Sequence, residues 1–393
     1  MTDIMTLTDE IINYWADNKN DPVALHLKQK LIPVEVSEHA IIFPPTYADI
    51  GYNIDTLTDG TKVVTIDSVG SQANRIEPVF KEEPYSALVP QIEIKLRDEK
   101  SENGTHTVKY SLLDFAHRSA DAVVMSCPDL ASQITSAFRA LHQSSDSGPL
   151  CELAPTSLLF GVWDSRGGTG EKRPRLIRSL IRAWDVEPLY AAAQFNSIWK
   201  ALDENQKSEL EKEAKSKKTK LSAKGFADAP ATFRKVSQSA AKSMTEFKNG
   251  APNPDRRVLG GVMVSGSIER DVTVNLSALR KINGEDDVAT KNIRRYLLSI
   301  TLLAATADFD LYLREGCHLR FAGEDEWYIV PRRGERISID LISNPAQKIL
   351  LNYANEAVKP FKSKWPEKTV YDFDMKEAKK LLAKKVEEEE SED

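Results

Sequence analysis

The sequence predicts an α+β fold in which one antiparallel sheet is flanked by helices. Strand-like and helix-like segments alternate irregularly, large insertions separate them, and no segment repeats with a period of about 20 to 50 residues. Of the 393 residues, 41% are apolar and 28% are charged, which is typical of a globular protein. We expect one elaborated domain over residues 1–380 and an acidic tail without fixed structure at residues 381–393.

The net charge of −6 comes from the chain end, because the last seven residues, EEEESED, carry six acids. Without them the body is neutral, so any basic surface is local. There is no apolar run of about 18 residues, which predicts no membrane span. Three scattered cysteines, Cys127, Cys151 and Cys317, show no CxxC spacing. We therefore expect no metal site, no disulfide framework and a reducing, cytoplasmic location.

The chain begins with a predicted helix within residues 1–30, which Thr8 can cap. Further helices are predicted at Ser111–Met125, Pro128–Leu141, Val288–Ala307 and Pro345–Ala357. Strands are predicted at Lys62–Val69, Leu88–Leu96, Gly260–Glu269, Val272–Leu276, Cys317–Phe321, Trp327–Val330 and Ile337–Leu341.

Hydrogen-bonding side chains follow the Lys62–Val69 strand, where Gly70 leads into a helix that Ser71 can cap. Such groups can hold a sugar-phosphate backbone or a base edge, although a plain capped helix start is the simpler local explanation. The residues concerned are Ser71, Gln72, Asn74 and Arg75.

Ser157–Trp184 predicts a strand at Ser157–Trp163, then a glycine-rich loop and a basic helix that starts at Pro174. On that helix Arg175, Arg178 and Arg182 share one face, and residues 166–182 carry a net charge of +5. Arginines beside a flexible loop favour an anion such as phosphate. Neither nucleotide-binding glycine fingerprint is met, and a solvated basic helix remains the alternative.

A helical and irregular insertion is predicted at about residues 203–258. Two arginines end it, Arg256 and Arg257, and Arg270 and Arg280 follow in the next elements. Arg75, Arg270 and Arg280 serve equally well as structural ion-pair partners of nearby acids.

Seven blocks, in order along residues 60–320, resemble the backbone-subunit family of type I-G (formerly I-U) CRISPR Cascade. They are Asp67–Glu77, Ala116–Ala122, Ser157–Ser165, Gly260–Arg270, Asn275–Arg280, Arg294–Leu298 and Leu313–Cys317. The resemblance implies a RAMP-superfamily protein with an RRM-like, ferredoxin-like core and large thumb or finger insertions.

It also implies the function. Such proteins polymerise as copies of one chain along the CRISPR RNA and present this guide to target DNA. They work with a large subunit and a repeat-end-binding RAMP subunit, away from any membrane, without a cofactor and without catalysis. The chain has no RNP1-type aromatic run, which agrees with a grip on the RNA backbone.

If the resemblance holds, the RNA-binding residues come from three places: the turn after the Lys62–Val69 strand, the basic part of Ser157–Trp184, and the arginines from Arg256 to Arg280. They are Ser71, Gln72, Asn74, Arg75, Trp163, Ser165, Arg166, Lys172, Arg173, Arg175, Arg178, Arg256, Arg257, Arg270 and Arg280.

Two other functions remain open. A RAMP-type endoribonuclease that processes the precursor CRISPR RNA would need histidines such as His117 and His318, but no paired catalytic constellation is visible. An enzyme acting on a phosphate ligand would use the glycine-rich loop, but it lacks the Walker lysine.

Overall fold

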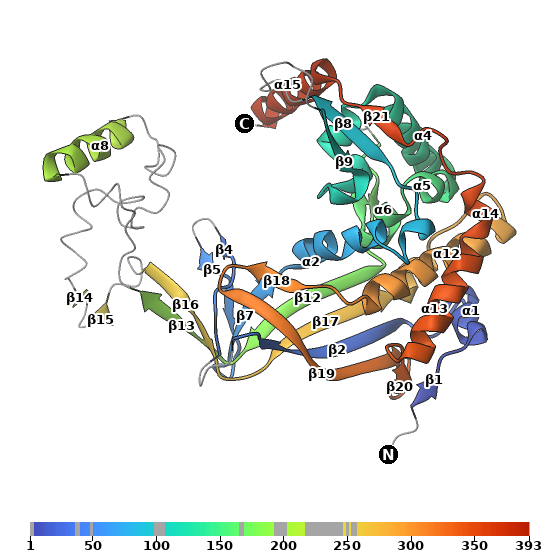
Figure 1. Ribbon diagram of the computed structural model, residues 1–393, viewed down its shortest axis with the longest axis horizontal. Helices are drawn as coiled ribbons and strands as arrows, with labels where there is room; N and C mark the ends of the chain where they lie inside the picture. The colour runs from blue at the N-terminus through green and yellow to red at the C-terminus, as the bar shows by residue number, and fades with distance from the viewer. Residues whose placement is uncertain are drawn as a thin grey trace.

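The computed structural model describes residues 4–35, 40–47, 50–97, 107–164, 169–191, 203–216, 247–248, 251–252 and 258–392. Its centre is an antiparallel sheet (Figure 1). The central strands are β2 (Ala24–Pro33), β12 (Ile177–Trp184), β17 (Ile268–Asn275) and β19 (Cys317–Val330). They lie side by side in the order β19-β2-β17-β12.

This strand order matches a ferredoxin-like core. Numbered along the chain, the central strands lie in the order fourth, first, third, second, and every neighbouring pair is antiparallel. Helices lie in the connection from the first strand to the second, and α12 (Asp287–Thr306) connects the third to the fourth. The chain thus has the βαββαβ order of that fold. The predicted α+β class is confirmed.

Short strands extend the sheet on both sides of this core. They are β1 (Met5–Thr6), β20 (Ile337–Asp340), β18 (Leu311–Arg314), β7 (Lys62–Asp67) and β6 (Ile54–Thr56).

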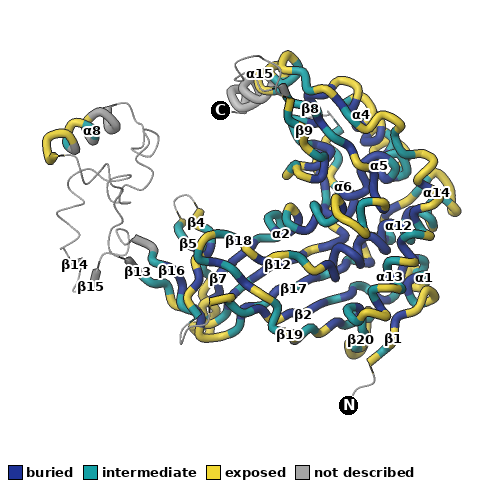
Figure 2. The backbone as a smooth tube through the Cα atoms, viewed as in Figure 1, coloured by how far each residue is buried: buried dark blue, intermediate teal, exposed yellow. Residues whose placement is uncertain are grey.

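The two faces of the sheet differ because successive side chains of a strand point to opposite sides. On the inner face Leu25 and Leu27 of β2 are buried in a cluster with residues of α1 (Asp9–Asp17), α12 and α13 (Asn344–Ala357). Figure 2 shows this buried layer between the sheet and the helices. On the outer face charged side chains pair across strands, as Lys28 does with Glu269 at 3.1 Å.

The inner face packs into two apolar clusters. The second lies toward the other end of the strands, with Leu31 of β2, Ile42 of β3 (Ala40–Ile42) and Val262 of β16 (Val258–Val264). Across this same face β2, β17 and β12 each also contribute one buried polar residue, Gln29, Arg270 and Ser179 respectively.

Arg270 joins these polar residues. Its Nε donates to Ser179 Oγ at 3.1 Å and its Nη1 donates to Gln29 Oε1 at 3.1 Å. The guanidinium lies 5.0 Å from the centre of the Phe309 ring. Burial lowers the pKa of Arg270 to about 10, so it still carries its charge at neutral pH.

A second group of helices stands beside a small sheet of strands β21, β8 and β9 (Figure 1). The helices are α3 (Ala122–Met125), α4 (Pro128–Ser144), α5 (Gly148–Leu153) and α6 (Pro155–Phe160). The strands are β21 (Val370–Asp372), β8 (Glu93–Arg97) and β9 (Thr107–Ser111). The chain continues through α14 (Lys359–Lys362) and ends with α15 (Met375–Glu392), which runs into the acidic stretch.

The β12–β17 hairpin continues beyond the sheet as an arm. β13 (Val186–Ala191) follows β12 and pairs with β16 (Figure 1). The other neighbour of β16 is β3. The insertion expected at residues 203–258 lies between the two arm strands. Its described parts are α8 (Glu204–Ser216), β14 (Phe247–Lys248), β15 (Ala251–Pro252) and the first residue of β16. That it forms a thumb or finger stays a prediction.

Several helices are confirmed, namely those expected at 128–141, 288–307 and 345–357. The strand predicted at Ser157–Trp163 is wrong, because most of that segment belongs to α6, and only β10 (Val162–Trp163) is extended. Every residue of α6 is buried, so the helix has no polar face to reveal its period.

The basic helix predicted after Pro174 is also wrong, because the segment forms strand β12. Arg178 and Arg182 still share a face, since their even spacing also fits a strand. The helix predicted at Ser111–Met125 is divided into the 3-10 helices η3 (Leu112–Asp114) and η4 (Arg118–Ala120) and the short α3.

Three strand boundaries also differ. A turn separates β16 from β17 within residues 260–269. The strand predicted at Val272–Leu276 is the second half of β17, which ends at Asn275, because Leu276 begins α11 (Leu276–Leu279). The strands predicted at 317–321 and 327–330 are one continuous β19 whose register shifts at a bulge.

Candidate nucleic-acid interface

Asp67, at the end of β7, organises the turn that follows. Its carboxylate is 1% exposed and accepts hydrogen bonds from Ser71 Oγ at 2.6 Å, Gln72 Nε2 at 2.7 Å and Arg75 Nε at 3.1 Å. Helix α2 (Val69–Ile76) therefore starts over a buried negative charge. Its cap is Ser68, whose side chain accepts from the Ser71 N–H, and the predicted cap at Ser71 is wrong.

These bonds occupy most of the side chains predicted to face RNA in this turn. Gln72 is 0% exposed, and its Oε1 accepts a further bond from Ser179 Oγ at 2.7 Å. Arg75 is paired with Asp67 and also donates to the Leu313 carbonyl at 2.8 Å. Asn74 is the exposed member of the group.

Asn74 is held by a buried arginine from a distant part of the chain. Arg118 Nη2 donates to Asn74 Oδ1 at 3.2 Å, and Nη1 donates to the Gly161 carbonyl at 3.4 Å. Its Nε lies 2.7 Å from Glu77 Oε2, and its guanidinium lies 5.2 Å from the Phe160 ring centre. Arg118 thus joins α2, the 3-10 helix η1 (Glu77–Lys81) and the end of α6.

The Arg118–Glu77 pair is buried, with side chains 5% and 1% exposed. Burial raises the pKa of Glu77 to about 7, against the lowering effect of the Arg118 charge. Burial likewise lowers the pKa of Arg118, and the positive charge of Arg175 lowers it further.

A tight crossing places Arg175 beside Gly161. Gly161 has φ +80°, and a Cβ added there would lie 2.9 Å from Arg175 Cγ and 3.1 Å from the Arg173 carbonyl oxygen. A residue with a side chain would strain this backbone and push Arg175 away.

Gly161 leads into a hairpin of β10 and β11 (Lys172–Arg173), in which Trp163 lies opposite Lys172. Val162 points into the core and Trp163 points outward, with 59% of its surface exposed. The Lys172 Nζ lies 5.8 Å from the centre of the Trp163 ring.

Three exposed cations of this region have no acidic partner in the described chain: Lys172, Arg175 and Arg178. In contrast, Arg173 Nε lies 3.0 Å from Glu171 Oε1. Arg178 projects from the outer face of β12, opposite Thr273. We use "basic corner" for Asn74, Trp163, Lys172 and Arg175, because strand pairing, the Gly161 crossing and Arg118 bring them together.

The later arginines hold the fold. Arg270 is 1% exposed and does not face solvent. Arg280 Nε donates to the Asn18 carbonyl at 2.7 Å, and its Nη2 donates to the Pro22 carbonyl, so it closes the end of α1. Four further predicted RNA-binding residues lie outside the described residues: Ser165, Arg166, Arg256 and Arg257.

Sequence reasoning missed Arg118 and Glu77 as organisers of this corner. The signal that was available is an arginine followed by small residues, of which Arg118, Ser119 and Ala120 are buried. A buried arginine requires a counter-charge, which identifies an acid elsewhere in the chain as its partner.

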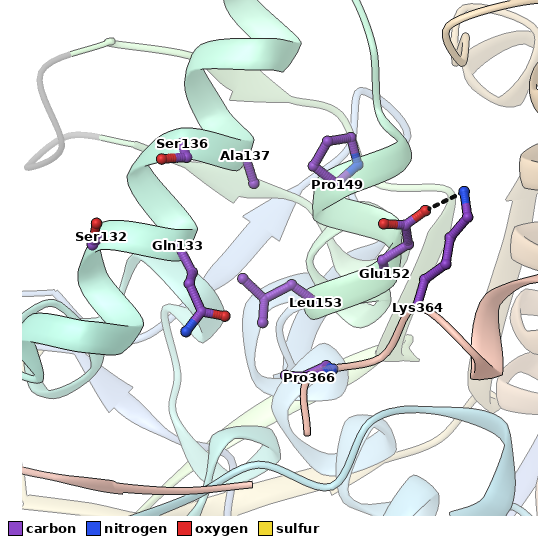
Figure 3. A pocket seen from close by; sticks show the side chains of 9 residues that line it. All are labelled: Ser132, Gln133, Ser136, Ala137, Pro149, Glu152, Leu153, Lys364 and Pro366. Atoms are coloured by element: carbon purple, nitrogen blue, oxygen red, sulfur yellow. Dashed lines mark ion pairs between the residues drawn. The ribbon is translucent and has the colours of Figure 1, made fainter. Parts of the chain in front are cut away.

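A pocket of about 390 Å³ lies away from these residues, between α4, α5 and the segment after α14 (Figure 3). A Glu152–Lys364 ion pair of 3.0 Å lies at one side of it. The lining residues are Ser132, Gln133, Ser136, Ala137, Pro149, Glu152, Leu153, Lys364 and Pro366. No predicted RNA-binding residue is among them.

Within the described ranges, no three or more His, Cys, Asp or Glu side chains gather as metal ligands. No described helix is long and apolar enough to cross a lipid bilayer. The cysteines are buried and free, and burial raises the pKa of the Cys127 and Cys317 thiols to about 11.

The segment that carries this corner resembles a known family. Residues 25–188 match the family model of CRISPR-associated protein GSU0053. The match covers less than half of the chain and supports a CRISPR-associated role. It runs from β2 into β13 and includes Glu77, Arg118 and the whole basic corner. No curated protein matches the chain.

Proposed function

We propose that this CRISPR-associated protein is a non-catalytic subunit that binds CRISPR RNA. Several copies assemble along the guide as the backbone of a type I-G Cascade complex and present it for pairing with target DNA. The observation that carries the proposal is the basic corner, where unpaired Lys172 and Arg175 lie beside exposed Trp163 and Asn74.

Cations without acidic partners favour phosphate, because they give up no internal ion pair on binding. Apart from Arg178, the outer face of the sheet differs in this respect. There Arg182 lies 3.4 Å from Asp271, and Lys28 lies 3.1 Å from Glu269. An RNA on the outer face would have to compete with these acids, so we place the backbone contacts at the basic corner.

Contacts to phosphates position an RNA without reading its sequence. A guide subunit needs this property, since it must hold any spacer and leave the reading to base pairing. Asn74 can add a hydrogen bond to a phosphate or ribose without selecting a base.

Processing of the precursor RNA has less support. His117 is exposed, and its backbone N–H donates to Asp121 Oδ2 at 3.3 Å. His318 lies in β19, with its ring packed edge-on against Tyr312 at 5.4 Å. In the described chain neither imidazole has an acidic or histidine partner that would tune it as a general acid or base.

The test is co-expression of the full chain with a CRISPR array, followed by size-exclusion chromatography. We expect a large species with a high ratio of nucleic-acid to protein absorbance and RNA of one discrete length. Protein that is free of RNA and does not bind single-stranded RNA at low salt would refute the proposal. Metal-independent cleavage of the precursor by the purified chain would show a nuclease instead.

A further inference from the structure

The backbone on both sides of Trp163 is anchored, although most of this residue is exposed. Its neighbours in the hairpin are fixed, since Val162 is buried and Asp164 is 1% exposed. Asp164 Oδ2 accepts from the Thr169 N–H at 3.2 Å and also from the Thr169 hydroxyl. The ring is therefore presented on a fixed support, and a ligand that packs on it pays little ordering entropy.

The other strand of the hairpin is anchored as well. Glu171, next to β11, lies 3.0 Å from Arg173 Nε, and its second oxygen lies 3.2 Å from His142 Nδ1 on α4. The hairpin is thus tied to the helical group at the strand opposite Trp163.

The surroundings of Trp163 indicate the class of ligand. A protein-docking tryptophan normally lies within an apolar patch. In the two strands of this hairpin Val162 is buried, and Lys172 and Arg173 are cationic, so Trp163 is the one exposed apolar side chain of β10 and β11. An aromatic ring bordered by unpaired cations is the arrangement that proteins use for single-stranded nucleic acid, with bases on the ring and phosphates on the cations.

We propose that Trp163 is a stacking platform for one unpaired base of the bound RNA, which rests on the proposed function. Lys172 covers one face of the indole, and the base stacks on the other. Lys172 and Arg175 then hold the phosphates that flank that base. The site accepts any base because every base has a π face.

The experiment measures the affinity of RNA-free full-length protein for a short, unstructured, fluorescein-labelled single-stranded RNA by anisotropy. A second probe is an abasic strand of the same length. Stacking predicts that Trp163→Ala weakens binding of the normal RNA about 5- to 100-fold, while Trp163→Phe retains most of the affinity. It also predicts that Trp163→Ala leaves binding of the abasic strand and the slope of affinity against salt unchanged.

Tyr14→Ala, at a 50% exposed aromatic of α1, is the matched control and should change nothing. Thermal denaturation of all variants checks folding. Equal binding of the normal RNA by wild type and Trp163→Ala would overturn the inference and leave the proposed function standing. Failure of the wild type to bind either strand would refute the proposed function itself. Loss of self-association with unchanged RNA affinity would show that Trp163 docks protein, which also overturns the inference.

Discussion

Neutralising the unpaired cations of the basic corner should change how RNA affinity depends on salt. Lys172→Gln with Arg175→Gln removes two positive charges that are exposed and make no ion pair in the described chain. For single strands, the slope of log affinity against log salt is about −0.7 for each phosphate contact, so the variant's slope should be shallower by about 1.4. With equal binding at molar salt, this corresponds to about 60-fold weaker binding at about 50 mM salt and about 10-fold at about 200 mM.

The assay is fluorescence anisotropy with single-stranded RNA across a potassium chloride series. Lys109→Gln is the matched control, because Lys109 is an exposed cation that already pairs with Glu93 at 2.7 Å. Arg178→Gln, on the outer face, tests whether the RNA also reaches that side. An unchanged slope for the double variant, or a loss of affinity equal at all salt concentrations, would show that the corner does not contact phosphates.

Three further variants test the support behind the corner. Burial raises the pKa of Glu77 from 4.5 to about 7, so the folded state holds this proton more tightly and stability should fall as pH rises through that window. Glu77→Gln should remove this pH dependence of stability, while leaving Arg118 without a counter-ion. Curves of melting temperature against pH that run parallel for wild type and variant would contradict this prediction. Gly161→Ala, at φ +80° and ψ 148°, should cost roughly 1–3 kcal/mol and weaken RNA binding by displacing Arg175; an unchanged melting temperature would refute the strain. Arg270→Met should cost roughly 1–3 kcal/mol for each of the two buried side chains left without its donors, measured by urea denaturation; a stability equal to wild type would show that those partners re-pair.

The fold class was predictable because it depends on local patterns. Helices α12 and α13 begin with their own caps, Asp286 and Ser343, and α13 also has an apolar stripe, so the sequence shows them. The order of strands was not predictable, since it depends on pairing between segments far apart, as Lys28 with Asp271 or Leu27 with Trp327. Local patterns contain no information about such partners.

Two predictions near the basic corner were wrong, the strand at Ser157–Trp163 and the helix after Pro174, and both errors come from patterns that fit a helix and a strand equally well. Apolar runs that are buried all round look alike as helix or strand, which explains α6. In β12, Arg178 and Arg182 are four residues apart, which places them on one face of either a helix or a strand, and Pro174 suggested a helix start. The correct signal was the alternation of buried Ile177, Ser179 and Ile181 with the arginines, which only the strand explains.

Part of the candidate site was also visible in the sequence. Trp163, Lys172 and Arg175 are near each other in the chain, so local reading grouped them. Asn74 joins these residues through its hydrogen bond with Arg118. That contact links distant parts of the chain, so the sequence did not show it. For Arg270 a clue existed, because it lies two residues from both Ile268 and Val272, so a period of two already places it with these apolar residues on the inner face.

The arm has a consequence for how the chain can vary. Ala191 and Val258 are partners across the last rung between β13 and β16, so the chain ends on either side of the insertion are held together by the strands themselves. Lengthening a connection whose ends are already held costs little, since each doubling adds only about 0.6 kcal/mol of closure entropy. Relatives can therefore gain or lose large segments at this point while the register of β12 against β17, and with it the position of Arg175, stays the same.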